Sequence, residues 1–344
     1  MQYKNILVWL PSPVGDAILC TPVLRAIRRH FSDAQITFFG RPVVREILSP
    51  CSFNNEWLEQ QSKNLFTTAN TLKGHKFDCA VLFKNSFASA MTVFFVGIPK
   101  RIGYAREGRG FLLTDKLFPP KLPDGRFKPL SMLDYYLEIA KYLGADTNGR
   151  TLELSVDPPD SQTLRAKLPQ IVNSNKPIII FVPGGAFGQS KCWPADRFAQ
   201  TAERLISGYN AEIIISVAAN REEQQIAGEI CSLSRYELVS LAETPISLGE
   251  LKALFSIAGL VISNDTGPRH IAIALRRKVI SLFGPNDPAW TDSRYENEIQ
   301  IVGNAPCAPC ARPKCKEARH LCMESITVEM VCEAAAKLLG KSQK

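Results

Sequence analysis

One aspartate stands at the point where a buried strand gives way to a helix near the start of the chain. The stretch LPSPVGDAILCTP, residues 10–22, follows the apolar run ILVW and carries Gly15 and Asp16 at the turn. A dinucleotide-binding turn would read G-x-G-x-x-G here, because its glycines let a pyrophosphate approach the backbone. We expect the helix N-terminus to keep the Asp16 carboxylate ionised, and that charge would repel a phosphate. The turn therefore presents an acid or base and does not cradle a nucleotide.

A glycine-rich turn follows the strand-like run 178–182 and reads PGGAFGQSKCWP, residues 183–194. Its glycines let a ligand approach the backbone, a helix is expected to begin near Pro194, and Lys191 adds a positive charge. A P-loop would place the lysine directly after the glycine, whereas two residues separate Gly188 from Lys191. The turn is either an anion site that suits a phosphate or a plain strand-to-helix connection.

Two further turns of the second half carry acidic residues. In the turn NDTGPRH, the Asp265 carboxylate can accept hydrogen bonds from sugar hydroxyls, and Thr266 and Gly267 offer a hydroxyl and free amides. The same residues also make an ordinary helix cap. Glu222 and Glu223 follow another strand, where a carboxylate can hold ribose hydroxyls or simply suit the first turn of a helix.

Strand-like and helical runs alternate along both halves of the chain and would position these turns. Continuous apolar strands separated by helices indicate parallel sheets covered on both faces. We therefore predict an α/β fold of two doubly wound domains, with ligands bound beyond the carboxyl ends of the strands. The expected strands are 5–10, 35–40, 77–83, 100–104, 178–184, 211–218, 260–265 and 278–284. The expected helices are 17–31, 43–50, 86–97, 194–208, 221–233, 248–259 and 268–276.

The positive charge of the chain is concentrated in its first half. Residues 1–155 carry 20 lysine and arginine residues against 13 aspartate and glutamate residues, whereas the remainder carries 21 against 20. Arg25, Arg28 and Arg29 share one face of an expected helix, and Arg101 lies in a basic loop. This excess favours an anionic partner, which could be nucleic acid, an acidic membrane surface or a phosphorylated substrate. Any one of these residues can equally belong to an ordinary solvated surface.

Four of the ten cysteines are spaced C-x2-C-x4-C-x6-C. They could hold a structural metal, form disulfides or stay free, and the spacing matches neither the usual zinc pairs nor a ferredoxin run. The sequence shows no signal peptide and no apolar run of about 20 residues, which predicts a cytoplasmic chain with reduced thiols. His270 is expected to be a packed helix histidine and not a metal ligand. The four cysteines are Cys307, Cys310, Cys315 and Cys322.

Taken together, these turns resemble glycosyltransferase family 9, the ADP-heptose:lipopolysaccharide heptosyltransferases, across nearly the whole chain. The matching segments are ILVWLPSPVGDAILCTPVLRAIR, PGGAFGQSKCWPADRFAQTAERL and SNDTGPRHIAIALRRKVISLFGP. Within the family, the segment 83–115 looks most like the heptosyltransferase II group. The sequence departs from the family pattern at Cys192, where a basic residue is usual, and at Pro268-Arg269, where a more apolar pair is usual.

The resemblance implies a GT-B architecture, with two Rossmann-like domains facing a central cleft. It implies an acceptor domain over 1–155, a linker over 156–177, a nucleotide-sugar domain over 178–325, and a C-terminal helix over 326–344 that crosses back toward the first domain. It also implies inverting transfer of heptose from ADP-L-glycero-D-manno-heptose to the inner core of lipopolysaccharide, without a metal or other cofactor. The sequence lacks the Asp-x-Asp motif with which metal-dependent glycosyltransferases hold Mg²⁺.

The resemblance assigns roles to the residues of these turns. Asp16 matches the catalytic base, and Lys191 would stabilise the departing ADP. The donor-binding residues would be Gly184, Gly185, Ala186, Gly188, Ser190, Glu222, Glu223, Asp265, Thr266 and Gly267. The acceptor-binding residues would be Ser12, Arg25, Arg28, Arg29 and Arg101.

The implied partners are ADP-heptose, an anionic lipid A–Kdo acceptor of the heptosyl-Kdo2-lipid A type, and the cytoplasmic face of the inner membrane through peripheral contact. Nothing in the sequence resembles a nucleic-acid-binding motif. One alternative is another family 9 transferase with a different acceptor or sugar. A second is a sugar-nucleotide-binding protein without activity, against which Asp16 and Lys191 argue. A third is a sugar-nucleotide epimerase of GT-B fold, which gives the basic first half no role.

Overall fold

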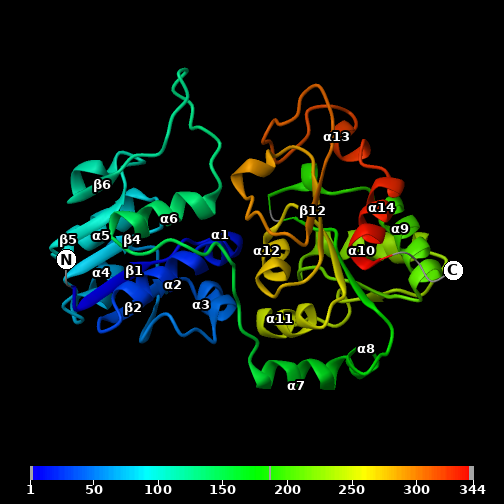
Figure 1. Ribbon diagram of the computed structural model, residues 1–344, viewed down its shortest axis with the longest axis horizontal. Coiled ribbons are helices and arrows are strands. Elements are labelled where there is room, and N and C mark those ends of the chain that lie inside the picture. The colour runs from blue at the N-terminus through cyan, green and yellow to red at the C-terminus, as the bar shows by residue number, and fades with distance from the viewer. Residues whose placement is uncertain (1–2, 186, 341–344) are drawn as a thin grey trace. The chain divides into compact units, whose positions relative to one another are not determined.

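The computed structural model describes residues 3–185 and 187–340, and these residues form two compact units (Figure 1). Unit 1 holds residues 3–155 together with 289–293, and unit 2 holds 156–288 and 294–340. The short segment 289–293 joins unit 1 through a hydrogen bond from Ser131 Oγ to the carbonyl oxygen of Asp292, at 2.6 Å.

Unit 1 is built on a six-stranded sheet with the order β3-β2-β1-β4-β5-β6, in which all neighbouring strands pair in parallel. The chain first winds from β1 to β3 and then from β4 to β6, so the winding direction reverses between β1 and β4. This is the switch point at which open α/β sheets bind ligands beyond the strand ends. The strands are β1 (Asn5–Trp9), β2 (Gln35–Gly40), β3 (Glu56–Glu59), β4 (Cys79–Leu82), β5 (Lys100–Tyr104) and β6 (Asp115–Leu117).

Helices connect the strands of unit 1 (Figure 1). The single helix expected over 17–31 is divided at Cys20, because Pro22 has no backbone N–H to continue the first helix and instead begins the second. The helices are α1 (Val14–Leu19), α2 (Thr21–His30), α3 (Pro42–Leu48), α4 (Leu65–Lys73), α5 (Phe87–Phe95), the 3₁₀ turn η1 (Arg109–Leu112) and α6 (Met132–Tyr142).

Unit 2 repeats the plan with the order β12-β11-β10-β7-β8-β9, again all parallel. Its switch point lies between β10 and β7. The strands are β7 (Ile178–Val182), β8 (Glu212–Ile215), β9 (Val239–Ser240), β10 (Leu260–Asn264), β11 (Val279–Phe283) and β12 (Glu298–Val302). The helices are α7 (Pro158–Lys167), α8 (Pro169–Val172), η2 (Gln189–Lys191), α9 (Ala195–Tyr209), α10 (Arg221–Leu233), α11 (Leu248–Ser256), α12 (Gly267–Ala274), α13 (Leu321–Glu324) and α14 (Val328–Leu339). The 3₁₀ turn η3 (Pro288–Trp290) begins at the last residue of 156–288 and continues into the segment 289–293 of unit 1.

The segment expected as a linker is largely helical and belongs to unit 2. Helix α7 packs beside α11, and Lys167 forms an ion pair with Glu250 at 2.8 Å. At the other end of the chain, α14 packs against α9 and contributes Val331 and Ala335 to the core of unit 2. The expected domain boundaries and the crossing of residues 326–344 stay predictions, and residues 341–344 lie outside the described part of the chain.

The central strands are buried on both faces, as continuous apolar runs predict. Strands β4, β7, β10 and β11 are buried at every position. The prediction of an α/β fold with two doubly wound parallel sheets is therefore confirmed. Among the described residues, no helix is both long enough and apolar enough to cross a bilayer.

Candidate functional site

Asp16 lies in the first turn of α1, directly beyond the carboxyl end of β1 and at the switch point of unit 1. The side chain is half-buried, and among the described residues no hydrogen bond or ion pair holds its carboxylate. Burial raises the pKa of Asp16 from 3.8 to about 6. The helix N-terminus is expected to favour the ionised carboxylate, whereas burial acts in the opposite direction and raises the pKa. A carboxylate with this pKa is ionised at neutral pH and is matched to general-base work.

Three basic side chains follow the carboxyl ends of strands β2, β3 and β4 in unit 1. Arg41 directly follows β2, Lys63 comes shortly after β3, and Lys84 comes shortly after β4. Burial lowers the pKa of Lys84, and the charges of Arg41 and Lys63 lower it further, so the three cations are close to one another. We call these residues the basic edge. Sequence reasoning missed them, although each one follows a strand or strand-like run.

The loops after β4 and β5 are braced by a buried arginine. Arg109 is fully buried, and its guanidinium donates to the carbonyl oxygens of Tyr104 (2.9 Å) and Lys84 and to Asn85 Oδ1 (2.9 Å). Burial lowers the pKa of Arg109 to about 10. Because its donors are used on the backbone and on Asn85, Arg109 fixes the loop that carries Lys84.

Tyr136 of α6 connects Asp16 electrostatically with the loop after β5. Burial raises the pKa of the Tyr136 hydroxyl, with further contributions from the charges of Cys20 and Asp16, while Arg106 lowers it. Arg106 also lies over the ring of Phe127, 4.3 Å from the ring centroid. The charges of Asp16 and of a cation in the β5 loop thus act on the same buried side chain.

Two of the expected acceptor-binding arginines are occupied within unit 1. Arg25 pairs with Glu153 and donates to the carbonyl oxygen of Gly149 at 3.1 Å. Arg28 donates to Asn55 Oδ1 at 2.8 Å and to the carbonyl oxygens of three residues after α2. Those three residues are Phe31, Ser32 and Ala34. Both side chains tie α2 to other segments.

Arg29 differs from its two neighbours. It is exposed, and within the described ranges no hydrogen bond or ion pair engages its side chain. Ser12 lies half-buried in the turn between β1 and α1. Of the three arginines of α2, Arg29 is the one whose charge is open to a ligand.

The contrast between Arg28 and Arg29 predicts that only Arg28 contributes to stability. Arg28→Gln should lower the free energy of unfolding by about 1–3 kcal/mol, because backbone carbonyls lose their donor. Arg29→Gln should leave the melting temperature unchanged and affect only the use of an anionic ligand. Thermal unfolding of both variants followed by circular dichroism would measure this, and equal melting temperatures would contradict the structural role of Arg28.

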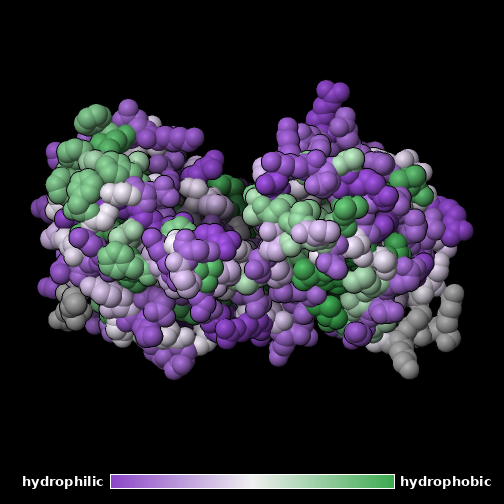
Figure 2. All heavy atoms as spheres, turned by 90° about the horizontal axis from the view of Figure 1, so that it is seen from above, coloured by the Kyte–Doolittle hydropathy of each residue, from purple (hydrophilic) through white to green (hydrophobic). Residues whose placement is uncertain are grey.

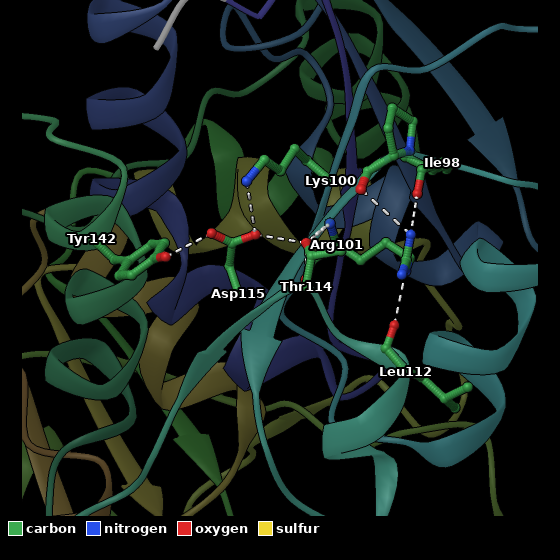
Figure 3. A network of polar contacts seen from close by, with 8 residues as sticks. Ile98, Lys100, Arg101, Leu112, Thr114, Asp115 and Tyr142 are labelled. Atoms are coloured by element: carbon green, nitrogen blue, oxygen red, sulfur yellow. Dashed lines mark hydrogen bonds and ion pairs between the residues drawn. The ribbon is translucent and has the colours of Figure 1, made fainter.

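Arg101 is the third expected acceptor-binding arginine whose side chain is engaged within unit 1 (Figure 3). Its guanidinium donates to the carbonyl oxygens of Ile98 (2.6 Å) and Leu112 (2.8 Å), and so joins the loop before β5 to η1. Its backbone N–H donates to Thr114 Oγ1 at 2.8 Å.

Figure 3 also shows how this network continues into an acidic centre. Asp115 accepts hydrogen bonds from Thr114 (2.6 Å), Tyr142 (2.7 Å) and Lys100 (3.5 Å). Burial would raise the pKa of Asp115, but these three donors hold it below its usual value. The network fixes β5, β6 and the end of α6 together.

In unit 2, Asn264 holds the glycine-rich loop closed at its base. Its Nδ2 donates to the carbonyl oxygen of Pro183 at 2.5 Å, and its Oδ1 accepts from the backbone N–H of Trp193 at 3.3 Å. One fully buried amide at the end of β10 therefore fixes both ends of the loop after β7. Sequence reasoning placed Asn264 in the right turn but assigned it no role.

The middle of the same loop rests on the segment before α13. Ser190 Oγ donates to the carbonyl oxygen of Arg312 at 2.6 Å. Gly188 has φ +142°, and a Cβ there would collide with the carbonyl oxygen of Pro313, so only glycine fits. Gly184 and Gly185 also lie in this loop, whereas Ala186 lies outside the described residues.

Lys191 and Asp265 form a buried ion pair between the two turns. The Lys191 ammonium lies 2.6 Å from Asp265 Oδ2 and 3.0 Å from the Asp265 carbonyl oxygen, and both residues are 7% exposed. Burial would raise the pKa of Asp265, but the charge and hydrogen bond of Lys191 outweigh it and hold the pKa below its usual value. Asn286 also donates to Asp265 Oδ2 at 3.1 Å, and the ring of Phe187 lies 4.7 Å from the ammonium.

The remaining expected donor residues lie at the start of α12 and in the first turn of α10. Thr266 is the N-cap of α12, but its hydroxyl makes no capping hydrogen bond there, and Gly267 is the first residue of the helix. Glu223 accepts from the backbone N–H of Ala218 at 2.8 Å and lies so close to Gly184 that a Cβ on the glycine would collide with it. Glu222 is exposed next to it.

Helix α12 carries two buried polar residues with structural roles. Arg269 is fully buried and pairs with Glu298 through two hydrogen bonds of 2.6 and 3.0 Å. The arginine at which the sequence departs from the family pattern therefore has a structural partner. His270 is buried, and desolvation, followed by the charge of Arg269, lowers its pKa to about 3. His270 is therefore a neutral, packed histidine, as expected.

The cysteine segment is a cluster of free thiols. Burial raises the pKa of Cys322, with smaller contributions from Cys307, Cys310 and Cys315, which places the four sulfur atoms within electrostatic range of one another. All of them are unbridged. In the described part of the chain, no group of three or more His, Cys, Asp or Glu residues is arranged to hold a metal.

The two units therefore offer complementary chemistry. Unit 1 presents a carboxylate suited to accepting a proton and cations at the same edge of its sheet, and unit 2 presents a buried ammonium, glycine amides and carboxylates. The first arrangement suits an anionic substrate with a reacting hydroxyl, and the second suits a diphosphate with attached sugars.

Comparisons with known proteins agree with this chemistry. The sequence model of glycosyltransferase family 9 (heptosyltransferase) matches residues 65–320. Lipooligosaccharide heptosyltransferase 2 of Campylobacter jejuni subsp. jejuni serotype O:2 is 23% identical over 344 residues, covering 98% of this chain and 99% of that protein. Lipopolysaccharide heptosyltransferase 2 of Escherichia coli strain K12 is 28% identical over 303 residues, covering 83% of this chain and 84% of that protein.

Solved structures give the same picture of the fold. The structure of E. coli ADP-heptose LPS heptosyltransferase II aligns with a TM-score of 0.77 at 25% identity and covers 98% of each chain. The predicted GT-B fold class, with two Rossmann-like units, is confirmed by this likeness. The chain belongs to glycosyltransferase family 9, the heptosyltransferases, and is a glycosyltransferase.

Proposed function

We propose that this enzyme transfers heptose from ADP-L-glycero-D-manno-heptose to the inner core of lipopolysaccharide, with a heptosyl-Kdo2-lipid A type of acceptor and inversion at the anomeric carbon. It does so on the cytoplasmic face of the inner membrane. The names of the aligned relatives support the reaction class. The observation that carries the proposal is the unpaired Asp16 carboxylate with its pKa of about 6.

Asp16 acts as the general base. In an inverting displacement the acceptor hydroxyl attacks the anomeric carbon from the face opposite the leaving group, and its proton passes to a carboxylate oxygen of Asp16. Because no internal donor engages this carboxylate among the described residues, both of its oxygens are available to the hydroxyl. General-base catalysis of this kind contributes about 10²–10⁴-fold to the rate.

The basic edge holds the acceptor. An acceptor built on Kdo carries carboxylates, and lipid A carries phosphates, so each adds negative charge near the reacting hydroxyl. Arg41, Lys63 and Lys84 lie at the same edge of the sheet as Asp16 and supply opposite charge. Arg29, by contrast, lies in the last turn of α2, which leads to the amino end of β2 and so to the opposite edge of the sheet. This assignment gives the positive charge of unit 1 a function.

Unit 2 holds the donor and stabilises the leaving group without a metal. The glycine-rich loop and the Lys191 ammonium meet the charge of the diphosphate as the bond to the sugar breaks. The carboxylates of Asp265 and Glu223 accept hydrogen bonds from sugar hydroxyls. The Thr266 hydroxyl, which makes no capping hydrogen bond, donates to or accepts from them. Lys191 keeps Asp265 ionised, which preserves it as an acceptor.

The pKa of Asp16 predicts the pH dependence of the reaction. The active form is the carboxylate, so kcat/KM should rise with pH through an apparent pKa near 6 and then level off. Initial rates between about pH 5 and pH 8.5, with protein folding checked at each pH, would measure this. A profile that stays flat across this range would contradict the assignment of the base.

The reaction itself is tested with the purified protein, ADP-heptose and heptosyl-Kdo2-lipid A. We expect ADP release and an acceptor product heavier by one heptose, with NMR showing inversion of the anomeric centre. Transfer to a different acceptor or of a different sugar would favour another transferase of the same family. Retention of configuration would overturn the role of Asp16.

A further inference from the structure

Unit 1 exposes an unusual number of phenylalanine rings. Phe66 of α4, Phe111 of η1 and Phe118 after β6 are 74%, 72% and 73% exposed. Four more phenylalanines of the same unit are also exposed. We call the seven residues the aromatic surface, and they are Phe66, Phe87, Phe94, Phe95, Phe111, Phe118 and Phe127.

These rings belong to neighbouring elements. Helix α5 packs against both α4 and η1, and it carries three of the seven rings. Phe87 of α5 lies 6.1 Å from Phe111 of η1, and Phe94 lies 6.0 Å from Phe95, between ring centroids. In Figure 2, hydrophobic residues gather at the end of unit 1 where Figure 1 labels α5, β5 and β6. The rings of Phe87 and Phe111 thus join α5 and η1 in one exposed apolar area, and such areas mark binding surfaces.

Cations are interleaved with these rings. Arg101 lies over Phe94, 5.4 Å from the ring centroid, and Lys121 lies 5.9 Å from that of Phe127. The exposed segment after β6 carries further positive charge close to Phe118 and Phe127. The exposed basic residues of β6 and of this segment are Lys116, Lys121, Arg126 and Lys128, of which Arg126 forms an ion pair with Asp124. So many positive charges would fit an apolar protein interface poorly. They complement the negative charge of an anionic surface.

We propose that the aromatic surface is the face with which this enzyme binds an anionic phospholipid bilayer. Phenylalanine rings enter the boundary between headgroups and acyl chains, while the long basic side chains reach the phosphates beside them. The hydrogen bonds of Arg101 and Asp115 fix β5, β6 and η1, so the surface is formed before it meets the lipid. The inference rests on the proposed function, because a lipid-anchored acceptor is what brings the enzyme to a membrane.

The test measures binding to vesicles of phosphatidylglycerol mixed with phosphatidylcholine. The variant Phe95→Ser/Phe111→Ser/Phe118→Ser should lose affinity by at least about tenfold, because each ring contributes buried apolar area. The variant Lys121→Gln/Arg126→Gln/Lys128→Gln should bind more weakly at low salt, and its difference from the native protein should shrink as salt rises. The matched control Leu233→Ser/Met330→Ser replaces exposed apolar residues of unit 2 and should bind like the native protein.

Three results would overturn the proposal. One is a triple phenylalanine variant that binds the vesicles as well as the native protein. Another is equal binding of the native protein to vesicles of phosphatidylcholine alone, which would remove the anionic requirement. The third is a native protein that is dimeric in the absence of lipid while the triple phenylalanine variant is monomeric. The surface would then contact a second copy of the chain.

Transfer assays separate this inference from the proposed function. With a deacylated, water-soluble acceptor, the triple phenylalanine variant should keep the native rate, and with acceptor embedded in vesicles it should be slower by at least about tenfold. A native protein that binds vesicles but transfers no heptose would defeat the proposed function alone. A native protein that is active on the soluble acceptor and fails to bind vesicles would defeat the membrane inference alone.

Discussion

Asp16→Asn should fold, bind ADP and lose transfer by about 10²–10⁴-fold, the usual contribution of a general base. The amide keeps the size and hydrogen-bonding reach of the carboxylate but cannot accept the acceptor proton. Turnover of the purified variant would be measured as ADP release at saturating substrates, and ADP binding by calorimetry. The exposed Asp33→Asn, also in unit 1, is the matched control and should keep native activity.

The same substitution should make the protein more stable at high pH. The folded-state pKa of Asp16 is raised to about 6 from 3.8, so the folded protein disfavours the charged form. The associated destabilisation is absent below the unfolded pKa, develops between the two values and is complete above the folded one. Asp16→Asn should therefore raise the melting temperature at pH 8 and leave it unchanged near pH 3.5. An inactive variant that is also less stable at pH 8 would indicate a structural role instead.

The strands of both units could be predicted where they are buried on both faces. The runs that form β7, β10 and β11 are continuous in apolar residues and were predicted, whereas β12 (Glu298–Val302), beside β11, was not. Strand β3 was missed because its residues Glu56–Glu59 lie at the edge of the sheet and are only half-buried, so no apolar run marks them. Helix α4 was missed for a similar reason, since only Thr68 and Leu72 are buried in it.

The turns that carry the candidate site were predictable because doubly wound sheets place ligands beyond strand ends. The contacts inside the site were not. Lys191 meets Asp265 only because β7 and β10 are neighbours in the sheet, and the two residues are 74 positions apart. The clamp formed by Asn264 depends on the same adjacency. The direction of the Asp16 pKa shift depends on burial, which no local pattern reveals.

The cationic residues show the limit most clearly. Charge and helical spacing pointed to Arg25, Arg28 and Arg29, but neither shows which of these guanidinium groups the fold uses within unit 1. Arg25 and Arg28 are bound to carbonyl oxygens and side chains of unit 1. The basic edge would have been found by asking which cations follow strands, because Arg41 and Lys84 do so in the sequence itself.

Lys191→Ala should lower kcat by about 10²-fold, comparable to the loss of one preorganised donor from a developing anion. The departing ADP gains negative charge as the sugar bond breaks, and the ammonium lies in the turn that would hold the diphosphate. Activity should survive EDTA, because the glycine amides and Lys191 meet this charge. Steady-state kinetics of the native and variant proteins, each with and without EDTA, would measure both expectations. The exposed Lys176→Ala is the matched control.

The alanine variant also removes the partner of a buried carboxylate, so loss of stability must be separated from loss of chemistry. In the native protein the Lys191 ammonium donates to Asp265 at 2.6 Å. Lys191→Gln keeps an N–H donor next to Asp265 but removes the charge, so it should retain the fold and lower kcat. Lys191→Arg should recover only part of the rate, because the planar guanidinium does not fit the compact site of the ammonium. Folding must be followed during the EDTA experiment, since a chelator would also strip any metal taken up by the four clustered thiols. If EDTA abolished turnover of the folded enzyme, Mg²⁺ restored it and Lys191→Gln stayed fully active, a bound cation and not Lys191 would be meeting the charge of the leaving group.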